Sequence, residues 1–144
     1  MNHITVRLAA PSDAKALKRL NEAFNEPNLT SEAEIAASIL ENSNESVFLA
    51  ELDGRPIGFC CTQLIRSMCY KTPCAELTEL YVEEAYRRMG AARAMMEYAE
   101  EYMKERFGID EMHLLTGHNN FPAQAFYQAV GYKPDYEARF VKSL

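Results

Sequence analysis

Apolar and polar positions alternate along several short stretches of the chain, and such alternation predicts strands with one buried face. Asp53-Gly54 separates two of these stretches and predicts a tight hairpin, because its turn type needs positive φ at both central positions. The expected strands cover residues 4–8, 46–52, 56–65, 74–82, 112–116 and 136–141.

Four other stretches carry apolar residues at helical spacing. Ser12 is a candidate N-cap for the first helix, and Ser31 with Glu34 has the spacing of a capping box at the start of the second. Gly108 suits the end of the third. This order of strands and helices, without a linker or repeat, predicts one α+β or α/β domain over residues 1–144 with a mixed sheet. The expected helices cover residues 13–24, 31–41, 90–107 and 122–130.

The fourth expected strand changes the phase of its apolar positions. Ala75 and Leu77 are odd-numbered, whereas Leu80 and Val82 are even-numbered. Side chains of a regular strand alternate between its faces, so one face can hold all four only if a β-bulge lies near Thr78-Glu79. A strand end that is buried on both sides is the alternative.

The bulge has two consequences. It interrupts the hydrogen-bond ladder and leaves backbone amides free to bond something other than a neighbouring strand. It also directs Glu76, Tyr81 and at least one of Thr78 and Glu79 to the face opposite the buried apolar side chains.

Charge narrows the range of partners. The net charge is −6, and residues 21–54 contain eight acidic residues and no Lys or Arg. Nucleic acid is therefore not expected as a partner, because phosphate binding needs clustered cations. The acidic stretch either attracts a cationic amine or serves only as solvated surface. No apolar run approaches the ~18 residues that span a membrane, and no secretory signal pattern is present, so a cytoplasmic protein without a membrane partner is expected.

The four cysteines are Cys60, Cys61, Cys69 and Cys74, and they form no CxxC pair. No metal site is expected, because zinc ligand sets usually contain such pairs. Reduced, mostly buried thiols are the preferred interpretation, and a Cys69–Cys74 disulfide across a turn is the alternative.

The residues that follow the fourth strand favour an anion site. A short loop containing Arg87 and Arg88 leads into Gly90-Ala91-Ala92, which opens the third expected helix. The first amides of a helix lack internal partners and carry partial positive charge, and small residues let a pyrophosphate approach them. Many helices open with Gly or Ala, so this pattern alone has low specificity.

Two segments resemble the GNAT superfamily of acetyltransferases. Arg87, Gly90 and Ala92 occupy the defined positions of its acetyl-CoA-binding motif Q/R-x-x-G-x-G/A, after a strand that ends in Leu80-Tyr81-Val82 like the L-x-V of that family. Residues 120–132 resemble its N-x-x-A-x-x-L/F-Y-x-x-x-G-F/Y segment at every defined position.

This resemblance implies a fold and an activity. The fold is a central mixed, mostly antiparallel sheet of six to seven strands with about four helices and a bulge in the fourth strand. The activity is transfer of an acetyl group from acetyl-CoA to a primary amine, by direct attack of the amine on the thioester and without a metal. The resemblance is also compatible with a homodimer.

The resemblance further implies contacts to acetyl-CoA. Backbone amides near Leu80–Val82 polarise the thioester carbonyl, and amides from Arg88 to Arg93 hold the pyrophosphate. Arg87 and Arg88 add charge unless they are only surface cations, and Asn120 either meets the pantetheine arm or caps its helix. The implied cofactor-binding residues are Leu80, Tyr81, Val82, Arg87, Arg88, Met89, Gly90, Ala91, Ala92, Arg93, Asn120, Ala123, Phe126 and Tyr127.

Three side chains are implied in catalysis. Tyr127 is the candidate general acid, because its phenol stays protonated and can donate to the departing sulfur, although a core aromatic is the alternative. Glu79 is the first candidate for the base and Glu76 the second. Alternatively, both carboxylates bind the substrate cation, and the amine loses its proton to bulk water.

The acidic stretch favours a small cationic acceptor, such as a polyamine or an aminoglycoside-like amine. A protein or peptide N-acetyltransferase is one alternative. A non-catalytic acyl-CoA-binding or regulatory domain is another, because fold does not fix function.

Overall fold

The computed structural model describes residues 3–144. Its sheet has the strand order β1-β2-β3-β4-β5, and all neighbouring strands are antiparallel except β4 and β5, which are parallel. The elements are β1 (Ile4–Leu8), the 3₁₀ turn η1 (Pro11–Asp13), α1 (Ala14–Phe24), α2 (Glu32–Glu41), β2 (Glu45–Leu52), β3 (Arg55–Ile65), β4 (Cys74–Val82), the 3₁₀ turn η2 (Glu84–Tyr86), α3 (Ala91–Phe107), β5 (Met112–Leu114) and α4 (Phe121–Ala129).

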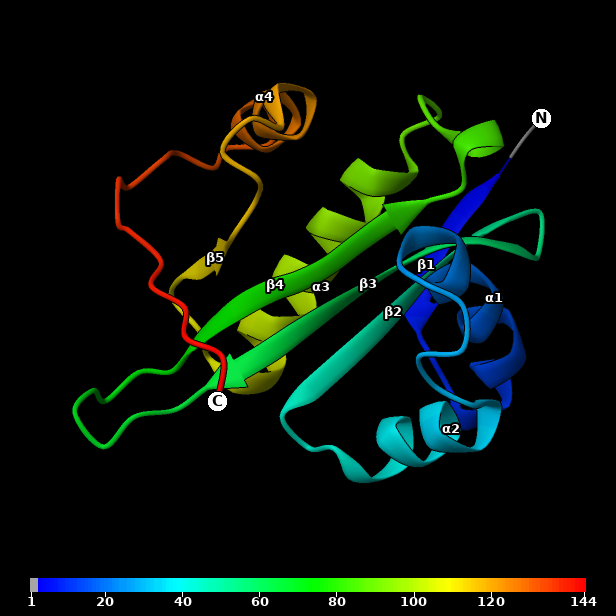
Figure 1. Cartoon of the computed structure of the whole chain (residues 1–144), viewed down its shortest axis with the longest axis horizontal. Coiled ribbons are helices and arrows are strands. Elements are labelled where there is room, and N and C mark those ends of the chain that lie inside the picture. The colour runs from blue at the N-terminus through cyan, green and yellow to red at the C-terminus, as the bar shows by residue number, and fades with distance from the viewer. Residues whose placement is uncertain (1–2) are drawn as a thin grey trace.

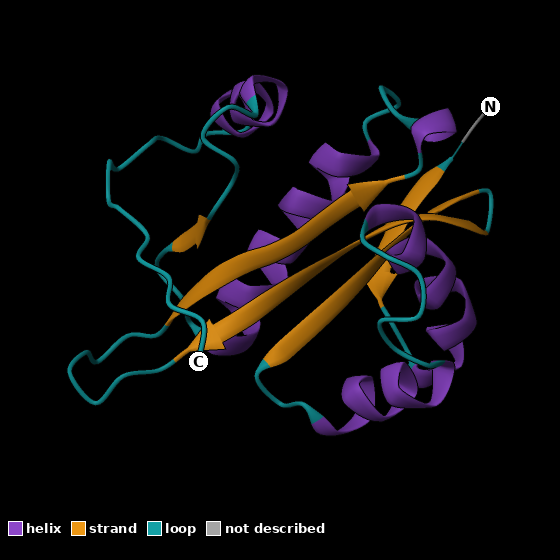
Figure 2. Ribbon diagram, viewed as in Figure 1, coloured by secondary structure: helices purple, strands orange, loops and turns teal. Residues whose placement is uncertain are grey.

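Helices cover both faces of this sheet (Figures 1 and 2). α1 and α2 lie on one face, where the buried side chains of Leu17 and Leu20 pack against the sheet. α3 crosses the other face and contributes the fully buried Met95, Met96 and Met103. α4 follows β5 and lies beyond the β5 side of the sheet (Figure 1). The predicted α+β architecture with a mixed sheet and four α-helices is confirmed.

The number of strands was predicted wrongly. The sheet has five strands instead of six or seven, and the strand expected at residues 136–141 is absent. From residue 132 to residue 144 the chain has no regular secondary structure. A strand needs a partner edge as well as a suitable residue pattern, and this segment pairs with none in the described structure.

The predicted β-bulge in β4 is confirmed. Cys61 of β3 pairs with Glu79, and the next residue, Thr62, pairs with Leu77, so Thr78 is the extra residue of the ladder. The Thr78 hydroxyl donates a hydrogen bond to the Cys61 carbonyl at 3.3 Å. Apolar residues on both sides of the bulge therefore reach one core, while Glu79 turns to the face that α1 and α2 cover.

Two local predictions are also confirmed. Asp53 and Gly54 have φ angles of 50° and 84°, as the hairpin turn requires. Ser31 and Glu34 form the reciprocal capping box, in which the Glu34 N–H donates to Ser31 Oγ at 3.1 Å and the Ser31 N–H to Glu34 Oε2 at 2.8 Å. These signals are local, so they need no knowledge of the tertiary structure.

The entry to α1 differs from the prediction. The 3₁₀ turn precedes the helix, and the N-cap position falls on Asp13 instead of Ser12. The Asp13 carboxylate accepts a hydrogen bond from the Ala10 N–H at 2.7 Å. The carboxylate of Asp13, and not the hydroxyl of Ser12, therefore accepts the backbone N–H at this turn.

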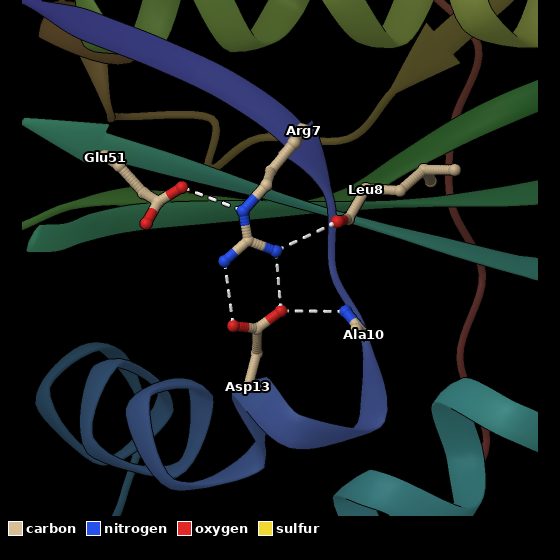
Figure 3. Close-up of polar contacts among 5 residues, drawn as sticks. All are labelled: Arg7, Leu8, Ala10, Asp13 and Glu51. Atoms are coloured by element: carbon tan, nitrogen blue, oxygen red, sulfur yellow. Dashed lines mark hydrogen bonds and ion pairs between the residues drawn. The ribbon is translucent and has the colours of Figure 1, made fainter. Parts of the chain in front are cut away.

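Arg7 of β1 links the start of α1 to the sheet by hydrogen bonds (Figure 3). Its guanidinium donates two hydrogen bonds to Asp13, at 2.7 and 2.9 Å, and one to Glu51 of β2 at 2.8 Å. A third acceptor is the Leu8 carbonyl at 3.2 Å. The hydrogen bonds from Arg7 are the main cause of a lowered pKa of Asp13. The network ties two strands to the start of α1, which covers one side of the site described next.

Candidate functional site

The sheet opens beside the second half of β4. β5 pairs with β4 only at residues 75–77, so within residues 3–144 the part of β4 after the bulge has no neighbour on that side. The Glu83 N–H donates to the Ile57 carbonyl of β3 at 2.8 Å, and bonding direction alternates along an antiparallel strand. The N–H groups of Leu80 and Val82 therefore point away from β3 and into the opening.

The N-terminus of α3 supplies a second set of unpartnered amides. Gly90 is the N-cap with a φ of 88°, and the Ala94 N–H donates to the Gly90 carbonyl at 3.0 Å as the first helical hydrogen bond. The amides of Ala91, Ala92 and Arg93 precede this bond and have no helical partner. They form the positive end of the helix dipole, which suits an anion.

The basic side chains of the β4–α3 loop have different tasks. Arg87 Nε donates to the Val82 carbonyl at 2.9 Å, so this side chain holds the loop against the end of β4. Arg93 faces Glu97 at 3.9 Å. Arg88 is exposed, forms no ion pair within residues 3–144, and has a φ of 63°, which is unusual for a residue other than glycine. Arg88 is thus an exposed cation of this loop without an ion-pair partner among the described residues, next to the exposed Met89.

A cavity of about 300 Å³ lies between the opened part of β4 and α4. Phe24 of α1 closes one side, and its ring stacks on that of Tyr81 with centroids 5.1 Å apart. Six residues predicted from the two motifs or from the bulge meet in its wall: Thr78, Glu79, Leu80, Asn120, Ala123 and Tyr127. Residues more than 40 positions apart in the sequence are therefore neighbours here.

α4 turns Tyr127 toward this cavity. Asn120 caps the helix, because its Oδ1 accepts the Ala123 N–H at 3.2 Å. The Tyr127 hydroxyl forms no hydrogen bond to another residue in the described part of the chain, and burial is the main cause of its raised pKa. Phe126 does not line the cavity but packs against the α3-side core, with its ring 5.4 Å from that of Tyr127. It therefore packs beside Tyr127, and its contact with acetyl-CoA stays a prediction.

The two candidate carboxylates occupy different surroundings. Glu79 lines the cavity, and its pKa is raised, first by burial and second by the nearby charge of Glu45. Glu76 does not line the cavity. Its Oε1 lies 3.9 Å from Nε2 of His113 in β5. Only Glu79 is therefore placed with Tyr127.

Glu45 and Gln63 extend this polar surface and were not predicted as site residues. They pair across β2 and β3, and Gln63 Nε2 donates to Glu45 Oε2 at 3.1 Å. Gln63 also pairs with Glu76, so these side chains share the sheet face of Glu79. Burial raises the pKa of Glu45. Glu45 precedes the strand expected at residues 46–52, and its place opposite Gln63 follows from the register of β2 and β3, which the sequence of either strand does not reveal.

Other kinds of site find less support. No group of three or more His, Cys, Asp or Glu side chains able to hold a metal ion occurs within residues 3–144. All four cysteines are free thiols, so no Cys69–Cys74 disulfide is formed, and only Cys60 and Cys61 are buried. None of the helices in the described range has the length and apolar character needed to cross a membrane.

Known proteins share part of this sequence. An uncharacterized N-acetyltransferase of Chlorobaculum tepidum is 29% identical over 128 residues, which are 89% of this chain and 74% of the relative. The chain spans 42% to 60% of the length of three further curated N-acetyltransferases that it matches.

Solved structures share the fold. The aminoglycoside N-acetyltransferase AAC(6′)-Iy in complex with CoA aligns with a TM-score of 0.87 at 20% identity, over 99% of this chain and 96% of that one. The ribosomal-protein-alanine N-acetyltransferase from Brucella melitensis biovar Abortus 2308 aligns with a TM-score of 0.81 at 15% identity, over 98% and 99% of the two chains. At these identities the likeness shows a common fold.

The family model for the acetyltransferase (GNAT) family matches residues 14–132. This range includes the bulged strand, the N-terminus of α3 and the helix that carries Tyr127. The chain therefore belongs to the GNAT family of acetyltransferases.

Proposed function

We propose that this protein transfers an acetyl group from acetyl-CoA to a primary amine of a small cationic acceptor. One observation carries the proposal: two sets of unpartnered backbone amides, at the end of β4 and at the N-terminus of α3, flank an opening into which Tyr127 faces. Acetyl-CoA has a matching group for each set, a thioester carbonyl for the strand and a pyrophosphate for the helix.

The backbone does most of the binding. Acetyl-CoA supplies the acetyl group in activated form, as a thioester. The amides of Leu80 and Val82 donate to its carbonyl oxygen, where negative charge develops as the amine attacks. The amides of residues 91–93 bind the pyrophosphate, and Arg88 adds a positive charge. Both sets of amides belong to regular elements and are therefore already oriented before the ligand arrives.

Two side chains handle the protons. As the bond from the amine nitrogen to the acetyl carbon forms and the carbon–sulfur bond breaks, the amine loses a proton and the sulfur gains one. Glu79 accepts the first proton, directly or through water, and its raised pKa makes it a better base than an ordinary glutamate. Tyr127 donates the second, and its raised pKa keeps the phenol protonated at neutral pH.

The acceptor is attracted by the acidic sheet face. Glu45, Glu76 and Glu79 share this face, and the loop between α1 and α2, together with α2 itself, belongs to the stretch without Lys or Arg. Such a surface favours a positively charged amine. One aligned structure is named as an aminoglycoside acetyltransferase and another as a ribosomal-protein-alanine acetyltransferase, so the fold serves small and protein acceptors alike. The charge favours the small cation for this chain.

Thermal unfolding tests the cofactor part of the proposal. Acetyl-CoA at about 100 times its Kd should stabilise the folded protein by about 2.7 kcal/mol and raise the Tm. Acetylated pantetheine, which lacks the pyrophosphate, should give a smaller shift at the same concentration. If acetyl-CoA leaves the Tm unchanged, the cofactor assignment is wrong.

An amine screen tests catalysis and the acceptor class. The protein would be incubated with acetyl-CoA and polyamines, aminoglycosides, lysine peptides or peptides with free N-termini, and acetylated products measured by mass spectrometry. The proposal expects the highest kcat/KM for a polyamine or aminoglycoside. Preference for a peptide would reject the small-acceptor class, and binding without turnover of any amine would favour a non-catalytic acyl-CoA-binding domain.

A further inference from the structure

α4 carries Tyr127, but few contacts hold this helix in place. It lies beyond the β5 side of the sheet (Figure 1), and none of its residues, Phe121–Ala129, is buried. Near its start, Gln124 Nε2 donates to the carbonyls of Gly117 and His118, both at 2.9 Å, but these carbonyls belong to the loop that leads into the helix. The position of the Tyr127 hydroxyl therefore depends on the contacts that α4 makes with other elements.

The C-terminal end of α4 has a polar link to α3. The Tyr132 hydroxyl donates to Glu100 Oε2 at 2.6 Å, and both side chains are half-buried. Within residues 3–144 this is the only side-chain hydrogen bond that joins residues 120–132 to a helix or strand outside α4. Hydrogen bonds to a carboxylate are about twice as strong as those between neutral groups. The end of α4 is thus tied to the helix whose first amides we propose to bind the pyrophosphate.

The backbone connects this link to Tyr127. Gly131, with a φ of 102°, lets the chain turn back after α4. The Tyr132 N–H then donates to the Tyr127 carbonyl at 2.9 Å, and the centroids of the two rings lie 6.3 Å apart. A shift of the Tyr132 side chain would therefore move the last turn of α4, which includes Tyr127.

We propose that Tyr132 and Glu100 are positioning residues for acetyl transfer, because their hydrogen bond holds the Tyr127 hydroxyl at the cavity beside β4. This inference rests on the proposed function, in which Tyr127 is the general acid. Neither Tyr132 nor Glu100 lines that cavity, so both act through Tyr127. Proton donation needs the two heavy atoms within about 3 Å of each other, so a small displacement of the hydroxyl slows the reaction and leaves the amides of α3 in place.

The hydroxyl of Tyr132 is suited to this task and is not needed for packing. A phenylalanine ring would fill the same space, whereas the hydroxyl adds a bond of defined direction. Glu100 forms no ion pair within residues 3–144, so its carboxylate is free to accept this bond. Burial, together with the carboxylate, raises the pKa of Tyr132 and keeps the phenol protonated as the donor.

Steady-state kinetics of a double-mutant cycle test the positioning role. Tyr132→Phe keeps the ring and removes the hydroxyl, so kcat should fall about tenfold while the KM for acetyl-CoA stays within about twofold. Glu100→Ala should do the same. Glu100→Gln should recover most of kcat, because its amide oxygen still accepts the hydroxyl. In a Tyr127→Phe background, Tyr132→Phe should lower kcat no further, because the hydroxyl that it positions is gone.

Fluorine NMR tests the geometry without reference to activity. The protein would be labelled with fluorotyrosine, and the Tyr127 resonance assigned from its absence in Tyr127→Phe. This resonance should shift or broaden in Glu100→Ala and stay at its wild-type position in Glu100→Gln. Glu101→Gln is the matched control, because it removes a charge from the next residue of α3, which is exposed. The control should change neither the resonance nor kcat.

Two outcomes would overturn the positioning role: an unchanged Tyr127 resonance in Glu100→Ala, or an equal fall of kcat from Tyr132→Phe with and without the Tyr127 hydroxyl. Full turnover in Tyr127→Phe would instead reject Tyr127 as the acid, and the resonance would then decide whether the bond holds Tyr127 in place. Tyr132→Phe removes one oxygen from a half-buried side chain, so the Tm should fall by no more than about 8 °C and the variant should fold.

Discussion

Tyr127 and Tyr132 lie near each other at the end of α4, with ring centroids 6.3 Å apart, but their hydroxyls are used differently. The Tyr132 proton is committed to Glu100, and burial together with that carboxylate raises the pKa of Tyr132. The Tyr127 proton has no acceptor among the described residues and faces the cavity. Of the two phenols, Tyr127 is therefore the one that we propose as the general acid.

Tyr127→Phe removes this proton and keeps the ring. We expect kcat to fall about 100-fold or more, the usual range for loss of a general acid, while the KM for acetyl-CoA changes little. Tyr98→Phe, on the exposed face of α3, is the control and should keep wild-type kinetics. Steady-state kinetics with the best amine from the screen measure both, and undiminished turnover in Tyr127→Phe would exclude it as the acid.

The effect of Glu45 on the pKa of Glu79 can be tested at the residue scale. Glu79, the proposed base, must be ionised to accept a proton. Its raised pKa should therefore place the acidic limb of the kcat/KM profile above the ordinary glutamate value of about 4.3. Glu45→Gln removes one nearby negative charge, lowers the pKa of Glu79 and should move this limb to lower pH. Glu41→Gln changes an exposed acid of α2 and should leave the limb in place. If the acidic limb stays in place or moves to higher pH in Glu45→Gln, the charge of Glu45 does not raise the pKa of the catalytic base.

At the scale of elements, α3 begins and ends with a glycine in the left-handed region. Gly90 has a φ of 88° and Gly108 a φ of 68°, and an added Cβ would meet no atom within 4 Å at either position. Alanine at either site therefore costs only the backbone strain, about 1 kcal/mol. The two glycines differ in position, because only Gly90 lies beside the unpartnered amides.

Gly90→Ala and Gly108→Ala should consequently lower the Tm by similar amounts but differ in ligand binding. Gly90→Ala shifts the first amides of α3 and should weaken acetyl-CoA binding about tenfold, the loss of roughly one hydrogen bond to a charged group. Gly108→Ala should bind acetyl-CoA like the wild type. Calorimetry measures both Kd values, and equal affinities would show that the α3 N-terminus does not hold the pyrophosphate.

The same scale shows which features the sequence could predict. The phase change in β4, the Ser31 capping box and the Asp53-Gly54 turn depend on residues close together in the sequence, and each is confirmed. The prediction of a strand at residues 136–141 was wrong. The alternation of apolar and polar residues there indicates a local preference for extended backbone, but it does not supply a neighbouring strand to pair with. Glu45 was missed for a related reason: its position opposite Gln63 depends on strand register, which one chain segment does not reveal.

At the scale of the whole molecule, the sheet separates two cores, and β3 belongs to both. Adjacent residues of this strand point to opposite faces, so Cys60 is buried in the core under α3 and Cys61 in the core under α1 and α2. Burial raises the pKa of both thiols and keeps them unreactive while the fold is intact. The labelling rates of Cys60 and Cys61 therefore report separately on the opening of the two cores.

A cavity in one core should therefore expose both thiols if the molecule unfolds as one unit. Leu20→Ala, at a fully buried position of the α1-side core, should cost about 3 kcal/mol and speed thiol labelling about a hundredfold at both Cys60 and Cys61. Leu40→Ala, where the leucine is 75% exposed, should change neither rate. Labelling would be followed by peptide mass spectrometry in a Cys69→Ser, Cys74→Ser background. Faster labelling of Cys61 alone would mean that α1 and α2 open locally and that the core beneath them unfolds independently of the core under α3.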